Sequence, residues 1–212
     1  MSARPWSALD ARRIDAIVIG ASAGGVEALS EILPALRAEA TVATMVVLHI
    51  PRERPSLLAQ IFAAKCAQPV LEAQDKDPIQ AGTIYFAPPD YHLLVDEGTE
   101  GALLAMSNDE PVNFSRPAID VLFESAADQY GERLLGIVLT GGNQDGAAGL
   151  QAIRRAGGVT VVQDPQEAQA PYMPEQALAA GDIDYVLTLG QIAGLLRTLG
   201  ASGVREKENA GE

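Results

Sequence analysis

Short aliphatic runs alternate along this chain with segments of helical periodicity, and that alternation limits the possible folds more than any other feature. Residues 14–19 form an apolar run that stops at Gly20, which is typical of a buried strand. After the next turn, one apolar helix face is formed at helical spacing by Val26, Leu29, Leu33 and Leu36. Strands and helices in alternation predict an α/β fold, a doubly wound, mostly parallel sheet with helices on both faces.

The same pattern continues to the carboxyl end of the chain. We expect further strands at residues 44–48, 134–140, 159–162 and 185–189. We expect further helices at residues 56–67, 117–130, 146–156, 174–180 and 191–199, with a loop at Pro51 and Pro55 before the first, and Pro117 in the first turn of the second. A chain of 212 residues suits one domain over residues 14–199, between a flexible N-terminus (1–13) and a flexible C-terminal tail (200–212).

The middle of the chain has a different character. Three strand-like runs lie close together, at residues 83–87, 92–95 and 102–106. Turn-forming residues separate them, namely Gly82, Pro88-Pro89-Asp90 and Glu97-Gly98. Close spacing and turn residues predict antiparallel hairpins that are inserted into the parallel sheet or added to it.

Composition excludes several classes of function. Hydrophobic residues make up 48% and charged residues 20% of the chain, so a packed core is expected, and the net charge of −13 argues against nucleic acid or an anionic membrane as partner. A single cysteine, Cys66, allows no intramolecular disulfide and favours a cytoplasmic location. With only two histidines besides, we expect no metal and no cofactor. The first apolar run is too short to cross a membrane, so no membrane insertion is expected.

Three expected strand ends carry reactive or glycine-rich sequence, at residues 20–25, 49–51 and 140–146. Functional groups in open α/β sheets gather beyond the carboxyl ends of the strands. These ends supply a hydroxyl on Ser22, an imidazole on His49 and a carboxylate on Asp145. A hydrolytic triad needs a nucleophile, a general base and a group that orients the base, so we predict these three as catalytic residues.

Ser22 has two other interpretations. A serine before a helix is often only its cap, and the loop alone favours that interpretation. The glycines also suggest a dinucleotide site, but Gly20, Gly24 and Gly25 do not match G-x-G-x-x-G, and His49 stands where an acidic residue would hold a ribose.

The base and the orienting carboxylate each have competitors. We favour His49 over His92, since His92 starts a hairpin strand where a structural role is expected. Asp145 could simply cap the following helix. Other candidate carboxylates are Asp120, Asp128 and Asp164, but none lies in such a loop. The chain order Ser, His, Asp differs from that of the α/β-hydrolases and of the chymotrypsin and subtilisin types, which indicates a separate hydrolase lineage.

Six segments of the sequence, in order, resemble the catalytic domain of the chemotaxis protein-glutamate methylesterases, the CheB family. They are IGASAGGVEAL (19–29), HIP (49–51), YFAPPDYH (85–92), NFSRPAIDVLF (113–123), LTGGNQDGAAG (139–149) and Met173-Pro174. The resemblance covers about residues 14–199. It implies hydrolysis of γ-glutamyl methyl esters on chemoreceptor helices with release of methanol, and in some members deamidation of receptor glutamines. It assigns the triad to Ser22, His49 and Asp145, and an oxyanion hole to the backbone amides of Ala23 and Gly142.

The chain also departs from the family's pattern. The aspartate loop usually reads G-M-G-N-D-G, whereas Gly142, Asn143 and Gln144 fill its middle here, and Ser115 replaces a common histidine. Arg116 is a candidate contact for substrate carboxylates, or a surface arginine at a helix start. In the family a receiver domain usually precedes this domain, whereas only 21 residues stand before Ser22 here. We therefore expect activity that does not depend on phosphorylation within this chain, with control by a separate regulatory or kinase protein or by expression, or constitutive activity. The rival hypothesis is a non-enzymatic adaptor of the same fold that binds receptor helices or a kinase.

Overall fold

The computed structural model describes residues 6, 9, 12–50, 56–99 and 101–199. A parallel sheet of seven strands forms its centre, in the order β3-β4-β2-β1-β7-β8-β9. The strands are β1 (Ala16–Ala21), β2 (Ala43–Leu48), β3 (Val70–Glu72), β4 (Ile84–Phe86), β7 (Leu134–Val138), β8 (Val159–Gln163) and β9 (Tyr185–Leu187). The predicted fold class is confirmed.

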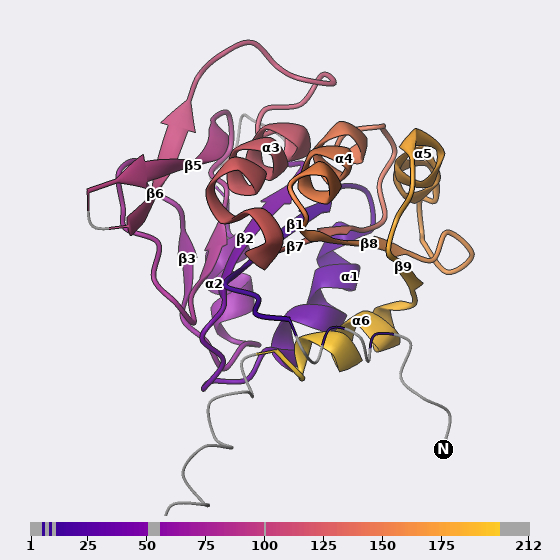
Figure 1. The fold of residues 1–212 in the computed structure, drawn as a ribbon, viewed down its shortest axis with the longest axis horizontal. Coiled ribbons are helices and arrows are strands. Elements are labelled where there is room, and N and C mark those ends of the chain that lie inside the picture. The colour runs from indigo at the N-terminus through magenta and orange to yellow at the C-terminus, as the bar shows by residue number, and fades with distance from the viewer. Residues whose placement is uncertain (1–5, 7–8, 10–11, 51–55, 100, 200–212) are drawn as a thin grey trace, which may run out of the picture.

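Helices cover both faces of the sheet (Figure 1). One layer consists of α3 (Ile119–Tyr130), α4 (Ala147–Arg155) and α5 (Tyr172–Ala180). The other consists of α1 (Gly25–Ile32), α2 (Leu58–Ala63) and α6 (Leu189–Leu196). Short 3-10 turns at Leu33–Ala35 and Gly131–Arg133 end α1 and α3.

Alternating side chains of each strand serve the two cores. Along β1, Ala16 and Val18 pack under the α3–α5 layer, whereas Ile17 and Ile19 pack under α1 and α6. All six residues of β1 are buried, as expected for a central strand of a parallel sheet. Two apolar residues of the segment expected to be flexible, Trp6 and Leu9, are buried in the α1–α6 core. The predicted C-terminal tail, 200–212, lies outside the described residues, as do Pro51 and Pro55.

The prediction for the middle of the chain is half right. Strands β5 (His92–Gly98) and β6 (Gly101–Ser107) form the expected antiparallel hairpin, which leans on α3 through a hydrogen bond from the Val95 amide to Ser125 Oγ. The run at 83–87 was wrongly assigned to such hairpins, because β4 lies in the main sheet, parallel to β2 and β3. All three residues of β4 are buried, which marks a strand covered on both faces.

One further difference concerns local detail. Helix α3 starts at Ile119, so Pro117 precedes it instead of occupying its first turn.

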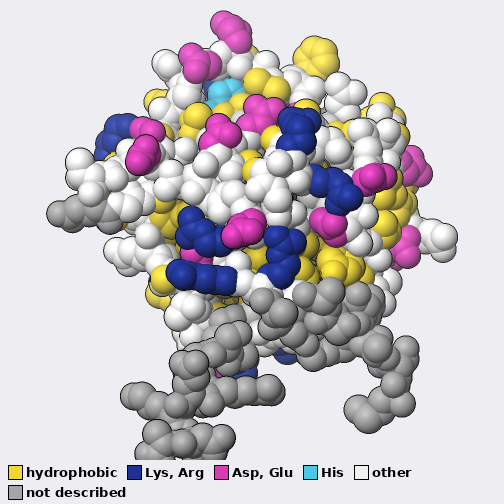
Figure 2. Space-filling view, in the orientation of Figure 1, with side chains coloured by type: hydrophobic (Ala, Val, Ile, Leu, Met, Phe, Trp, Pro, Cys, Tyr) yellow, Lys and Arg dark blue, Asp and Glu magenta, His cyan; other side chains and the backbone are white. Residues whose placement is uncertain are grey.

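Among the described residues no helix is both long and apolar enough to cross a bilayer. On the face drawn in Figure 2, basic side chains lie beside acidic ones. Paired examples are Arg133 with Asp15 and Arg154 with Asp184.

Candidate active site

The strand order brings the three reactive loops to one edge of the sheet. Strand β1 lies between β2 and β7, so the loop that carries Ser22 is flanked by the loops that carry His49 and Asp145. The His49 amide donates to the Ala21 carbonyl at 3.0 Å, and the Ser22 amide donates to the Thr140 carbonyl at 3.0 Å. Backbone pairing therefore continues past the strand ends and fixes the loops side by side.

Ser22 is part of a tight turn and does not cap α1. The turn closes with a 2.8 Å hydrogen bond from the Gly25 amide to the Ser22 carbonyl. Gly24 is the residue that caps α1, with φ +78°, and no side chain supplies a capping hydrogen bond there. The interpretation of Ser22 as a helix cap is therefore wrong. A Cβ on Gly141 would lie 3.0 Å from Ser22 Cβ, so glycine at 141 lets the two loops approach closely.

The imidazole of His49 faces two partners. Its Nε2 lies 2.8 Å from Oδ2 of Asp145, and its Nδ1 lies 3.4 Å from the hydroxyl of Ser115. Because a carboxylate only accepts, Nε2 carries the proton of the neutral ring and Nδ1 is left with its lone pair. The side chain of His49 is 12% exposed and that of Asp145 is fully buried. Asp145 therefore orients this ring, with the lone pair of Nδ1 toward the Ser115 hydroxyl.

Asp145 caps a helix, but not the one that follows it. Its carboxylate accepts from the amides of Ile119 (2.7 Å) and Asp120 (3.0 Å), the first residues of α3. Burial by itself would raise the pKa of Asp145, but the hydrogen bonds from His49 and from these two amides outweigh it and lower the pKa. Asp145 is therefore a buried, ionised partner for His49.

Asp120 makes the corresponding capping contacts with the start of α4. Its Oδ1 accepts from the amides of Gly146 (2.9 Å) and Gly149 (2.7 Å) at the start of α4. Asp145 therefore caps α3, the helix that carries Asp120, and Asp120 caps α4, the helix that follows Asp145. Burial, and next the charge of Asp145, raise the pKa of Asp120 to about 6, against the hydrogen bonds from the two glycine amides. The side-chain amide of Asn113 donates to Asp120 at 2.9 Å and to Asp145 at 3.4 Å. This exchange fixes the ends of α3 and α4 against each other.

Both residues of the predicted oxyanion hole are exposed at the strand ends. Within the described part of the chain, the amides of Ala23 and Gly142 donate no hydrogen bond. The Thr140 hydroxyl donates to the Ala23 carbonyl at 2.8 Å and so holds the peptide that follows Ala23. A Cβ on Gly142 would meet nothing within 4 Å, which leaves open space above this residue. Two free N–H groups beside open space can hold an oxyanion.

Arg116 links two loops instead of starting a helix. Its guanidinium donates to Asp90 at 2.7 and 3.1 Å and to the carbonyls of Asn108 and Asp109 at 2.8 and 3.0 Å. A contact of Arg116 with substrate stays a prediction.

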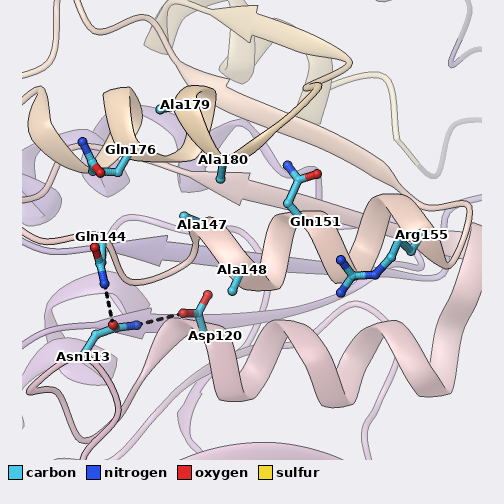
Figure 3. Close-up of a pocket in the computed structure, with 10 residues that line it drawn as sticks. All are labelled: Asn113, Asp120, Gln144, Ala147, Ala148, Gln151, Arg155, Gln176, Ala179 and Ala180. Atoms are coloured by element: carbon cyan, nitrogen blue, oxygen red, sulfur yellow. Dashed lines mark hydrogen bonds between the residues drawn. The ribbon is translucent and has the colours of Figure 1, made fainter.

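A cavity of about 520 Å³ lies beside the site, between α4 and α5, and Figure 3 shows Gln144, Asn113 and Asp120 joined by hydrogen bonds at one end of it. No three His, Cys, Asp or Glu side chains of the described residues gather as metal ligands.

Sequence reasoning missed three polar side chains that complete the site. Asn143 donates to the Ser115 hydroxyl at 3.2 Å, and Asn113 bridges the two carboxylates. Asp120 was considered only as a rival to Asp145. One signal in the sequence was available: Asn113, Ser115 and Asp120 lie within eight residues of one another. The first two stand just before α3, and Asp120 is in its first turn.

Over most of its length this chain is similar to known proteins. A family model described as "CheB methylesterase" matches residues 17–196. A protein of Leptospira interrogans whose name suggests protein-glutamate methylesterase and protein-glutamine glutaminase activity is 42% identical over 193 residues, 91% of this chain and 98% of that one. The protein-glutamate methylesterase/protein-glutamine glutaminase 1 of Dechloromonas aromatica is 38% identical over 94% of this chain and 56% of its own length. The crystal structure of the Thermotoga maritima CheB methylesterase catalytic domain matches with a TM-score of 0.84 and 28% identity, over 88% of this chain and 98% of that one.

Proposed function

Because this chain belongs to the CheB methylesterase family, we propose that it is a serine esterase that hydrolyses γ-methyl esters of glutamate on the cytoplasmic helices of chemoreceptors. Ser22 is the nucleophile, His49 the general base and Asp145 the group that orients the base. The observation that carries this proposal is the 2.8 Å pair of His49 and buried Asp145, next to the turn that holds Ser22. With Nε2 on Asp145, the nitrogen of His49 that accepts the proton in this proposal is Nδ1, which lies 3.4 Å from the Ser115 hydroxyl.

In the first step the Ser22 hydroxyl oxygen attacks the ester carbonyl and its proton moves to Nδ1 of His49. The carbonyl electrons move to the oxygen, where the amides of Ala23 and Gly142 stabilise the negative charge. The ring is now an imidazolium, and the Asp145 carboxylate on Nε2 offsets its charge. When the carbonyl re-forms, the C–O bond to the methoxy group breaks and Nδ1 returns the proton, so methanol leaves.

In the second step water attacks the acyl-enzyme and gives one proton to Nδ1 of His49. Collapse of the intermediate breaks the bond to Ser22, which takes that proton back, and a free glutamate side chain remains. A glutamine side chain forms the same acyl-enzyme with ammonia as leaving group. The names of the relatives, which pair methylesterase with glutaminase, support deamidation as a second activity.

The test is methanol release from methylated receptor membranes, compared between the wild type and Ser22→Ala. We expect the variant to lose activity by roughly 10⁴-fold or more, since the acyl-enzyme cannot form. Ser30→Ala is the matched control. Ser30 lies on α1, where its hydroxyl donates to the Val26 carbonyl, and its loss leaves the catalytic residues in place.

Each other outcome decides between hypotheses. Equal release by the wild type and Ser22→Ala would refute the serine mechanism. No release by either, together with binding of receptor membranes, would favour the adaptor. Ammonia release from receptors with glutamine at the same positions measures the second activity.

A further inference from the structure

The loop beside the site contains a two-residue turn of an unusual kind. Val112 and Ser115 pair in antiparallel fashion, with backbone hydrogen bonds of 3.1 and 2.8 Å between them. The two residues between them both have positive φ, +48° at Asn113 and +62° at Phe114. This is the backbone signature of a type I′ turn, in which asparagine followed by glycine is the favoured pair.

Phenylalanine is a poor choice for the second position of such a turn. A bulky side chain with positive φ crowds the backbone, whereas glycine has no such strain. Burial does not compensate, because Phe114 is 100% exposed. Nothing within the fold therefore accounts for an aromatic ring at this position, and glycine would give a more stable chain.

The position of the turn relates it to the site. Asn113, on one side of Phe114, donates to Asp120 and accepts from Gln144 at 3.2 Å (Figure 3). It also donates to Asp145. Ser115, on the other side, contacts His49. The backbone on both sides of the ring is thus fixed to the catalytic machinery, and the ring points into solvent at the rim of the site. A protein substrate bound at these residues would lie close to this ring.

We propose that Phe114 is a docking contact for the protein substrate and packs against an apolar side chain of the receptor helix that carries the modified glutamate. The inference rests on the proposed function, because it assumes that the site acts on a protein. Exposed aromatic residues contribute a large share of binding energy where they insert into a partner. The strained turn presents the ring without adjusting on binding, so little conformational freedom is lost.

The experiment compares two ester substrates, methylated receptor membranes and p-nitrophenyl acetate, a small ester that carries no polypeptide to dock. For Phe114→Gly we expect kcat/KM on receptor membranes to fall roughly tenfold, mainly through KM, while p-nitrophenyl acetate hydrolysis falls far less. Thermal unfolding should move to a higher temperature, since glycine relieves the strain. Phe114→Tyr keeps the ring and should recover most of the receptor activity. Val186→Ser removes another exposed apolar side chain, on the far strand β9, and is the matched control.

Other outcomes overturn the proposal. Wild-type activity of Phe114→Gly on both esters would show that no partner uses the ring. An equal loss on both esters would assign Phe114 to the geometry of the site. A lower unfolding temperature would refute the strain argument, and Phe114→Asn, which also tolerates positive φ, repeats that comparison. Conversion of a dimer to a monomer in sedimentation would assign the ring to self-association. Failure of the proposed function would give a different result, because Ser22→Ala would then keep wild-type activity.

Discussion

The two histidines of this chain lie in similar local settings and have different partners. His92 starts β5 and is 1% exposed. Its Nδ1 accepts from the Ala118 amide at 3.1 Å, and its Nε2 lies 3.2 Å from the Glu110 carbonyl. His49 follows β2 and has a carboxylate on Nε2 and a hydroxyl on Nδ1. Both rings are hydrogen-bonded through both nitrogens, so burial and pairing alone do not separate a structural histidine from a catalytic one.

The difference lies in what each partner allows the ring to do. A proton on Nδ1 of His92 would face the N–H of Ala118, so that nitrogen serves only as an acceptor in the fold. A proton on Nδ1 of His49 would face a hydroxyl oxygen that can accept it, and the charge would be offset by Asp145 on the opposite nitrogen. Only His49 can therefore take up and return a proton without breaking its own hydrogen bonds.

The largest expected effect comes from removing the ring that can be protonated. His49→Gln should lower kcat for methanol release by roughly 10⁴-fold, because glutamine cannot act as the base. Circular dichroism and thermal unfolding check that the variant is folded. If the folded variant keeps kcat within tenfold of wild type, another group is the base, and the contrast between the two histidines has no catalytic meaning.

The next effect comes from the partner of that ring. Asp145→Asn places an amide among N–H donors, because the carboxylate accepts from His49, Ile119 and Asp120. We expect kcat to fall roughly 10²- to 10⁴-fold, together with a lower unfolding temperature, because a donor faces buried donors. Asp164→Asn changes an aspartate that also follows a strand but caps only its own turn. If the two variants have equal kcat, Asp145 does not orient the base.

Asp120 should affect stability more than chemistry, and with a definite pH dependence. Its folded-state pKa of about 6 lies above the ordinary carboxyl value of 3.8. The folded state therefore holds this proton more tightly than the unfolded state. The associated stability is full below the unfolded value and is lost as the pH rises through about 6. The facing charged groups are Asp145 and Glu124, and both raise the pKa.

Asp120→Asn removes this charge and keeps an oxygen for the Gly146 and Gly149 amides. Relative to wild type, its free energy of unfolding should rise by on the order of 2 kcal/mol between pH 4.5 and pH 7. Denaturant unfolding at the two pH values measures it. If the difference in free energy of unfolding between Asp120→Asn and the wild type did not change with pH, the pKa of Asp120 would not be raised.

Much of the fold could be predicted because it depends on local signals, and the same signals select the three residues proposed as the triad. Strands β1, β2 and β7 are aliphatic runs that end at glycine or at a polar residue, and their ends carry the three reactive side chains. Strand β3 was missed because it has three residues, of which two are exposed. The helix exchange of Asp120 and Asp145 could not be predicted, since its hydrogen bonds join residues about 25 positions apart and leave no periodicity. In the same way, no pattern distinguishes the amide that faces His92 from the carboxylate that faces His49.

The smallest effect on activity, and the one that completes the comparison, is expected from His92→Gln. Glutamine can replace one of the two backbone hydrogen bonds but not both at the same spacing. We expect the free energy of unfolding to fall by about 1–3 kcal/mol, because a buried backbone group loses its partner, while kcat changes less than about threefold. A kcat loss close to that of His49→Gln in a folded His92→Gln would make both histidines catalytic, and would show that a backbone donor on Nδ1 does not mark a structural ring.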